Sequence, residues 1–231
     1  MSDFGLAIIM EYTECSPLIT EDELNDWYNI DRNPRYGPIP GILYMSRWKK
    51  TDTEYPSWLT VYDLAYPEIA QSPAFISILT NPSAKDISIL SRLQSFERRI
   101  YQIVGSYLKP NALLSQLALG KYTFVDHIEV TPMHEIEFNH WCDDEHMPML
   151  LGMPGWVRGR RYKLLERYKT ILGQYQMDDN PQIEYTMIHE LEVEGLAELP
   201  SYWEIVRTPW RDRVMGSTVK RELRLFERYS S

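Results

Sequence analysis

The sequence has 231 residues, of which 44% are hydrophobic and 25% are charged, and its net charge at pH 7 is -9. A chain of this length can bury one sizeable core or two small domains. Basic residues occur in pairs but never in a run, so the acidic balance argues against a protein that binds nucleic acid or an anionic membrane surface.

The cysteine content and the N-terminal residues indicate the cellular compartment in which we expect the protein. Two cysteines, Cys15 and Cys142, are too few for a disulfide framework and indicate free thiols in a reducing environment. The first residues lack the basic region and the apolar run of a signal peptide, and no apolar stretch is long enough to cross a membrane. We therefore expect a cytoplasmic protein without a membrane segment.

The first half of the chain predicts strand, helix, strand, strand, helix and strand, in that order. β-branched and aromatic residues favour strands over residues 4–12, 40–50, 57–65 and 96–104. Thr20 with Glu23 fits a capping box at the start of the first helix, and Ser72 before Pro73 fits the start of the second.

The second half predicts the same order of elements. Its strands are expected over residues 122–130, 154–164, 183–192 and 219–228. Thr131 before Pro132 fits a helix N-cap, and a second helix is expected to open at Leu199–Pro200. The order β-α-β-β-α-β is that of the ferredoxin-like unit.

The two halves also align in sequence. "LNDWYNIDRNPRYGPIPGI" (residues 24–42) matches "FNHWCDDEHMPMLLGMPGW" (residues 138–156) without a gap, with shared Asn, Trp, Pro and Pro-Gly positions. This predicts two ferredoxin-like repeats, 1–112 and 113–231. Each would leave one sheet face uncovered, so we expect an α+β fold in which the repeats pack sheet to sheet as an intramolecular barrel with a cavity between the sheets. Two independent domains are the alternative.

One string of the second repeat resembles a known family. It comprises Glu137, Asn139, Trp141, Glu145, His146, Pro148, Pro154 and Gly155, with Arg161–Tyr162 following. This string resembles the EthD-like branch of the dimeric α/β-barrel superfamily, and tandem copies are similar to fungal proteins of secondary metabolism. The resemblance implies a cavity for small aromatic or polyketide-like molecules. Superfamily members include cofactor-independent decarboxylases, cyclases and quinone-forming monooxygenases, and some bind haem.

All five histidines lie in the second repeat, where the first has Arg32 in place of His146 and Tyr62 in place of His189. Because imidazole titrates near neutral pH, this segregation indicates that the second repeat carries proton-transfer groups. The candidate catalytic residues are His146, His189 and His127. The end of a helix would favour His146 as the cation, and His127 could share a cavity with His189 if both strand faces point the same way. The alternative is that these histidines are buried, hydrogen-bonded side chains without a catalytic role.

Seven further residues are candidates for substrate binding. They are Asn139, Trp141, Arg160, Tyr162, Tyr185, Arg32 and Tyr62. An arginine in the cavity could hold a substrate carboxylate through two hydrogen bonds. Asn139 and Trp141 recur in the repeat that lacks histidine, which also fits a structural role. No glycine-rich phosphate loop or G-x-S-x-G elbow is present, and we expect no metal and no cofactor.

The predicted function is a cofactor-independent lyase or cyclase. It would decarboxylate, dehydrate or close a ring on an aromatic or polyketide-like molecule, with a histidine as general acid/base. Two alternatives stay open, a cofactor-free monooxygenase on the same substrates and a non-catalytic binding protein. The expected partner is a hydrophobic small molecule, with neither nucleic acid nor membrane, and the sequence leaves pairing into a homodimer open.

Overall fold

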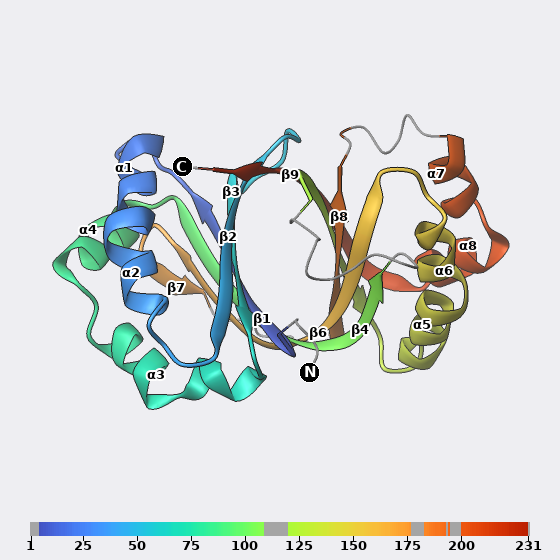
Figure 1. Cartoon of the computed structure of the whole chain (residues 1–231), viewed down its shortest axis with the longest axis horizontal. Helices are drawn as coiled ribbons and strands as arrows, with labels where there is room; N and C mark the ends of the chain where they lie inside the picture. Colours follow the sequence, from blue (N-terminus) through green and yellow to red (C-terminus); the bar gives the residue numbers. More distant parts are fainter. Residues whose placement is uncertain (1–4, 109–119, 177–182, 193, 195–199, 231) are drawn as a thin grey trace. The chain divides into compact units, whose positions relative to one another are not determined.

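The computed structural model describes residues 5–108, 120–176, 183–192, 194 and 200–230 (Figure 1). They divide into two compact units. Unit 1 takes the described residues of Met1–Gln102, Leu165–Asp179 and Tyr229–Ser231, and unit 2 takes those of Ile103–Leu164 and Asn180–Arg228. The predicted boundary between residues 112 and 113 lies outside the described residues and stays a prediction.

Unit 1 contains the first three strands, the first part of the fourth and four α-helices. In chain order its elements are β1 (Ala7–Glu14), α1 (Glu21–Asp26), the π-helical segment η1 (Trp27–Arg32), α2 (Asn33–Tyr36), β2 (Ile42–Lys50), β3 (Trp58–Leu64), the 3-10 segment η2 (Pro67–Gln71), α3 (Pro73–Thr80), α4 (Ala84–Arg92) and the first part of β4 (Ser95–Leu108). The last part of β6 (Trp156–Ile171) and β7 (Gln174–Gln176) also belong to it.

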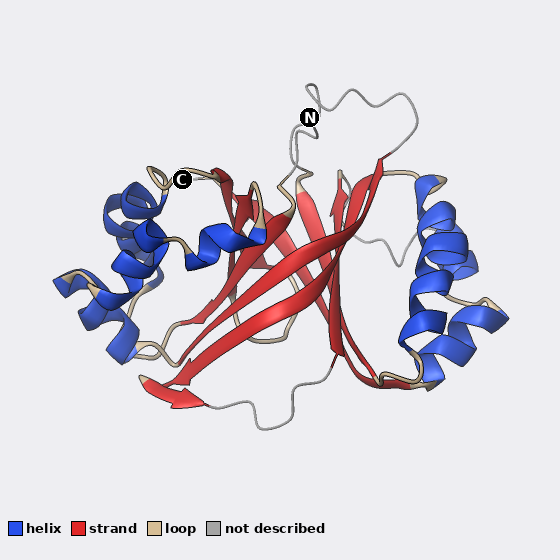
Figure 2. Cartoon of the chain, turned by 90° about the horizontal axis from the view of Figure 1, so that it is seen from below, coloured by secondary structure: helices blue, strands red, loops and turns tan. Residues whose placement is uncertain are grey.

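Unit 2 contains most of the later elements. They are β5 (Tyr122–Val130), α5 (Glu135–Trp141), the π-helical segment η4 (Cys142–His146), α6 (Met147–Leu151), the first part of β6, β8 (Ile183–Leu191), α7 (Pro200–Ile205), α8 (Pro209–Gly216) and β9 (Thr218–Tyr229) without its last residue. In each unit the helices lie together on one face of the strands (Figure 2).

The sheet of unit 1 has the strand order β4-β1-β3-β2, with antiparallel neighbours. Ile9 lies opposite Tyr62 on β3 and Ile100 on β4, so these three side chains share the face that the helices cover. The end of β6 lies beside β4, where the Leu172 amide donates to the Gln94 carbonyl at 3.1 Å.

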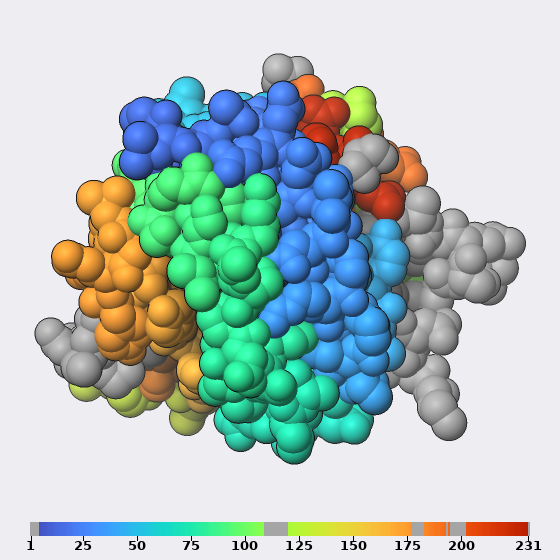
Figure 3. Space-filling model, turned by 90° about the vertical axis from the view of Figure 1, so that its left-hand side faces the viewer, coloured from blue at the N-terminus to red at the C-terminus, as the bar shows by residue number. Residues whose placement is uncertain are grey.

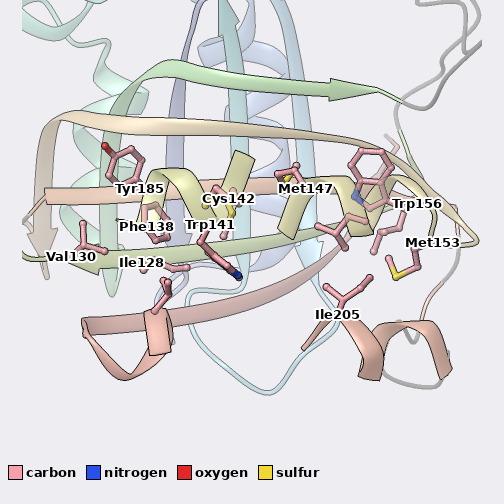
Figure 4. Packing of buried hydrophobic residues seen from close by; sticks show 14 of the residues in the cluster. Ile128, Val130, Phe138, Trp141, Cys142, Met147, Met153, Trp156, Tyr185 and Ile205 are labelled. Carbon is pink, nitrogen blue, oxygen red and sulfur yellow. The ribbon is translucent and has the colours of Figure 1, made fainter. Parts of the chain in front are cut away.

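The sheet of unit 2 has the order β9-β5-β8-β6. Phe124 lies opposite His189, and the residues on this face contact the helices. Figure 4 shows Phe138, Cys142 and Met147 from the helical segments packed in one hydrophobic cluster with strand residues Trp156 and Tyr185.

The structure confirms the predicted strands and corrects the start of one helix. Thr20 and Ser72 cap their helices, accepting hydrogen bonds from the amides of Glu23 and Phe75 at 3.1 and 3.3 Å. The Glu23 carboxylate, predicted to complete a capping box, instead accepts a hydrogen bond from Arg92 at 2.6 Å. Thr131 does not cap α5, because residues 131–134 form a turn and its hydroxyl contacts the Nδ1 of His134 at 2.9 Å. The helix therefore begins at Glu135. No helix in the described ranges is long and apolar enough to cross a membrane.

Candidate small-molecule site

A buried carboxylate lies under the helices of unit 1. Glu11 comes from the middle of β1 and has no exposed surface. Arg32, at the end of η1, donates from Nε and Nη2 to its two oxygens at 3.0 and 2.5 Å. Arg98 on β4 donates from Nε at 2.9 Å, and the hydroxyls of Tyr62 and Tyr28 lie 3.3 and 3.4 Å from Oε2. The carboxylate is therefore fully paired, as a buried charge requires.

The charges of this cluster stabilise one another. Burial alone would raise the pKa of Glu11, but the charges and hydrogen bonds of Arg32 and Arg98 hold the pKa of that carboxyl at about 2. Asp86 of α4 adds a second buried carboxylate, which accepts a hydrogen bond from Trp27 Nε1 at 2.9 Å and pairs with Arg35. Glu11 and Asp86 thus face three guanidinium groups.

A cavity of about 430 Å³ adjoins this cluster, and Arg32, Arg98 and Asp86 are among the residues that line it. Its lining comes from α3, α4, β4 and the part of β6 that belongs to unit 1, together with Arg32 and Tyr36. The lining is mainly apolar, with Phe75, Phe96 and Ile100 among its members. Volume and lining fit the range of small-molecule sites in proteins.

The turn between β6 and β7 closes one wall of the cavity. Leu172 and Gly173 both have positive φ angles, 49° and 73°, as a tight hairpin turn requires. A Cβ on Gly173 would lie 3.5 Å from the Cα of Ser91, so the turn rests against α4. Figure 3 shows this segment, in orange, beside the green α4 on one face of unit 1. Residues of the second predicted repeat thus complete the cavity of unit 1.

The sequence-predicted histidine pair lies in unit 2. His146 ends η4 and stacks on Trp141 with ring centroids 4.5 Å apart, and its ring meets that of His189 edge-on at 5.9 Å. Trp156 Nε1 donates to Nδ1 of His189 at 3.3 Å. The cavity beside the pair measures only about 20 Å³, enough for about one water.

Both imidazoles are held neutral. Burial lowers the pKa of His189 to about 4, assisted by the charge of Arg221. Burial, then His189 and the nearby arginines, lower the pKa of His146 well below its usual value. The expectation that the helix end favours the His146 cation is therefore wrong, since desolvation outweighs the helix dipole.

A paired carboxylate also lies under the helices of unit 2. Asp126 of β5 is 1% exposed and accepts hydrogen bonds from Arg221 of β9, with Nη2 at 2.6 Å from Oδ2. Arg32 in unit 1 and His146 in unit 2 each end a π-helical segment. In unit 1, Arg32 and Arg98 both pair with the buried carboxylate of Glu11. In unit 2, Arg221 pairs with Asp126, and the position that matches Arg32 carries the neutral His146.

The third predicted histidine lies on the other face of its sheet. His127 is opposite Thr186, so it does not share a cavity with His189, which is opposite Phe124. Nδ1 of His127 lies 3.6 Å from Glu184. Arg160 and Tyr162 lie on this same face, and Arg160 contacts Glu190 at 3.3 Å.

The remaining predicted residues form hydrogen bonds within the protein. Asn139 donates to the hydroxyl of Tyr185 at 3.0 Å, and Tyr185 donates to Glu135 at 2.7 Å. Trp141 donates from Nε1 to Glu145 at 3.0 Å. The structure therefore brings together His146, His189 and Trp141, and separately Arg32 and Tyr62.

The sequence interpretation missed Glu11, Arg98 and Asp86. A signal was present for Glu11, because a lone acidic residue interrupts the apolar strand "AIIMEY". Glutamate is almost never fully buried unless it is paired, so this position predicts a buried ion pair. No cluster of three or more His, Cys, Asp or Glu side chains arranged to hold a metal ion is found in the described part of the chain.

Solved structures resemble the chain along nearly its whole length. An anthrone oxidase-like protein superposes with a TM-score of 0.64 at 12% identity, covering 99% of this chain and 93% of its own. A monooxygenase candidate from Lactobacillus acidophilus gives 0.55 at 13%, covering 97% and 94%. A chlorite dismutase candidate gives 0.55 at 12%, covering 98% and 96%.

The chain therefore shares the α+β fold of these structures. No protein-family model matches the sequence, and no curated protein matches it. At these identities the likeness extends to the fold and not to a reaction.

Proposed function

We propose that the chain binds an aromatic or polyketide-like small molecule in the 430 Å³ cavity of unit 1 and converts it without a cofactor. The observation that carries the proposal is this cavity, apolar on its walls and lined at its base by the buried Arg32 and Arg98. An apolar pocket with a few fixed polar groups is the usual design of a small-molecule site.

Two reaction classes remain within the proposal. A lyase or cyclase would decarboxylate, dehydrate or close a ring on the substrate, and a monooxygenase would add oxygen to it. The names of the similar structures, among them an anthrone oxidase-like protein, support the second class as much as the first. A binding protein without catalysis is the third outcome.

A second candidate for the chemistry is proton transfer at His146 in unit 2. The observation that favours it is that Nδ1 of His146 is buried and has no hydrogen-bond partner among the described residues. A neutral imidazole has one ring nitrogen that can accept a proton. The catalytic roles of His189 and His127, and the binding roles of Arg160 and Tyr162, stay predictions.

The wider setting is proposed from the sequence resemblance. We infer a tandem duplication within the EthD-like branch, supported by the Trp141, His146 and Pro154–Gly155 string and by the shared order of elements. The same inference includes packing of the two repeats around a cavity between their sheets. It also includes a cytoplasmic location, a role in secondary metabolism and association into a homodimer.

The test is comparative mass spectrometry of metabolite extracts incubated with purified protein under air and under nitrogen. Ile76 lines the cavity and is 40% exposed on α3, so Ile76→Trp should block the entrance without disturbing the core. Ile87→Trp is the matched control, because Ile87 is 58% exposed on the next helix and lies outside the cavity lining.

We expect conversion by the wild type and by Ile87→Trp but not by Ile76→Trp. Loss of CO2 or water, or isomerisation, would identify a lyase or cyclase, and an added oxygen that requires air would identify a monooxygenase. Conversion that survives Ile76→Trp and is lost in His146→Ala would move the chemistry to unit 2 and contradict the proposal.

A further inference from the structure

We infer that the ligand of the unit 1 cavity carries an anionic oxygen on an aromatic ring system, and that Arg98 binds this oxygen. The inference rests on the proposed function and names the chemical class of its ligand. A carboxylate and a phenolate or enolate share the required chemistry, which is a negatively charged oxygen beside an apolar ring.

The first step concerns the hydrogen-bond donors of Arg98. Its Nε donates to Glu11 at 2.9 Å, and its Nη2 lies 2.9 Å from Glu11 and 3.3 Å from the hydroxyl of Tyr36. No hydrogen bond is formed by Nη1 within the described ranges of the chain. Arg98 lines the cavity and keeps 10% of its side chain exposed. Two N–H groups of a rigid, positively charged fork therefore remain for a ligand.

The second step concerns Arg32, which binds the same Glu11 carboxylate as Arg98. Its Nε and Nη2 are used by Glu11, and its Nη1 is 3.6 Å from Asp86, beyond hydrogen-bond distance. The ring of Tyr36 lies 4.9 Å from its guanidinium carbon, which holds the group in place. With its side chain only 3% exposed, Arg32 lines the base of the cavity, positions Glu11 and adds positive charge there.

The third step is the charge balance of the cavity base. Arg32, Arg98 and Arg35 face two carboxylates, Glu11 and Asp86, so the base has one positive charge in excess. Glu166 is the other acidic residue of the lining, and it is exposed to solvent, which screens it. An uncompensated cation in a desolvated corner favours an anion over a neutral group of equal shape.

The fourth step concerns the body of the ligand. Phe75, Phe96 and Ile100 form apolar walls on the same cavity, and Phe96 lies 5.4 Å from the guanidinium carbon of Arg98. A flat aromatic ring system fits this wall while its oxygen reaches Nη1 of Arg98. A wholly apolar molecule would leave that donor unpaired.

The experiment compares two probes of the same shape, 2-naphthoate and 2-naphthamide, by titration calorimetry. We expect the wild type to bind the carboxylate at least about tenfold more tightly than the amide, as a hydrogen bond to a charged group provides. Arg98→Gln should lose this preference while still binding the amide. Arg92→Gln is the control, since Arg92 pairs with Glu23 and is outside the cavity lining.

A second probe distinguishes a phenolate from a carboxylate. 4-Nitro-1-naphthol changes its visible absorbance when its hydroxyl ionises, so the spectrum of the bound dye reports its charge. We expect the bound dye to ionise at a lower pH than the free dye in the wild type and in Arg92→Gln, but not in Arg98→Gln. Ile76→Trp should abolish binding of all three probes, which locates them in the cavity.

The outcomes separate the two proposals. If the wild type binds 2-naphthoate and 2-naphthamide equally, the anion inference is wrong while the cavity remains a small-molecule site. If no probe binds, or if Ile76→Trp binds them unchanged, both proposals fall. The comparison of 2-naphthoate with 2-naphthamide in the wild type tests the preference for an anion even if Arg98→Gln does not fold.

Discussion

Arg32 donates two hydrogen bonds to Glu11, and both side chains are buried, with 3% and 0% of their surface exposed. Replacing the carboxylate by an amide removes the negative charge that compensates two guanidinium groups. We expect Glu11→Gln to lower the free energy of unfolding by about 3–5 kcal/mol, because two buried cations then lack their partner. Urea unfolding monitored by circular dichroism measures the loss.

Glu21→Gln is the control for this substitution. Glu21 pairs with Lys49 at 2.7 Å, but half of its side chain is exposed, so its removal should cost less than about 1 kcal/mol. Equal losses for the two variants would mean that the Glu11 cluster contributes no more than a surface ion pair.

The buried histidines predict a loss of stability in mild acid. The pKa of His189 is about 4 in the folded protein, below its ordinary value, and the pKa of His146 is lower than usual as well. Between pH 6.5 and 4 the unfolded chain therefore binds more protons, and the free energy of unfolding falls as pH falls. From pH 7 to 5.5 we expect about 1 kcal/mol from His189, and a loss in the same direction from His146.

His189→Gln should weaken this pH dependence, and His140→Gln, on an exposed helix face, is the matched control. Urea midpoints at pH 7 and 5.5 test the expectation above the range in which Glu11 titrates, since the folded-state pKa of Glu11 is about 2. An unchanged slope in His189→Gln would show that this imidazole is not held neutral by burial.

Tyr185 was predicted to bind substrate, whereas its hydroxyl bonds to Glu135 and Asn139 at 2.7 and 3.0 Å. We expect Tyr185→Phe to destabilise the fold by about 1 kcal/mol and to leave binding of 2-naphthoate unchanged. Thermal unfolding and calorimetry measure the two effects, and Tyr66→Phe, at a half-exposed tyrosine, controls for loss of a hydroxyl. Lost binding with unchanged stability would support the predicted substrate role.

Gly159 leaves room for the histidine site of unit 2. A Cβ there would lie 2.5 Å from Cε of Met147, 2.8 Å from the Trp156 ring and 3.1 Å from Nδ1 of His189. We expect Gly159→Ala to cost about 1–3 kcal/mol and to shift tryptophan fluorescence, because the indole and imidazole must both move. Gly216→Ala, with no atom within 4 Å of the added carbon, should change stability by less than about 0.5 kcal/mol. Similar costs for both would contradict this packing.

The residue pattern determined the order and type of the elements. The strand at residues 122–130 begins and ends where predicted, and Ser72 caps its helix before Pro73 as its motif requires. These features depend on side chains within a few positions of one another, through strand alternation and hydrogen bonds to nearby amides. The same local patterns identified Arg32 and His146 as residues that differ between two otherwise similar segments.

Tertiary structure alone decided which of these residues meet. Glu11 is bound by Arg32 and Arg98, which are 21 and 87 positions away, and the cavity wall near α4 comes from residues 166–173. Such contacts depend on strand register and on the helices that cover one sheet face, and a shift of one residue would turn every side chain to the other face. His127 and His189 are similar in sequence terms, yet this alternation places them on opposite faces, and burial makes His189 neutral where the sequence alone predicts an ordinary imidazole.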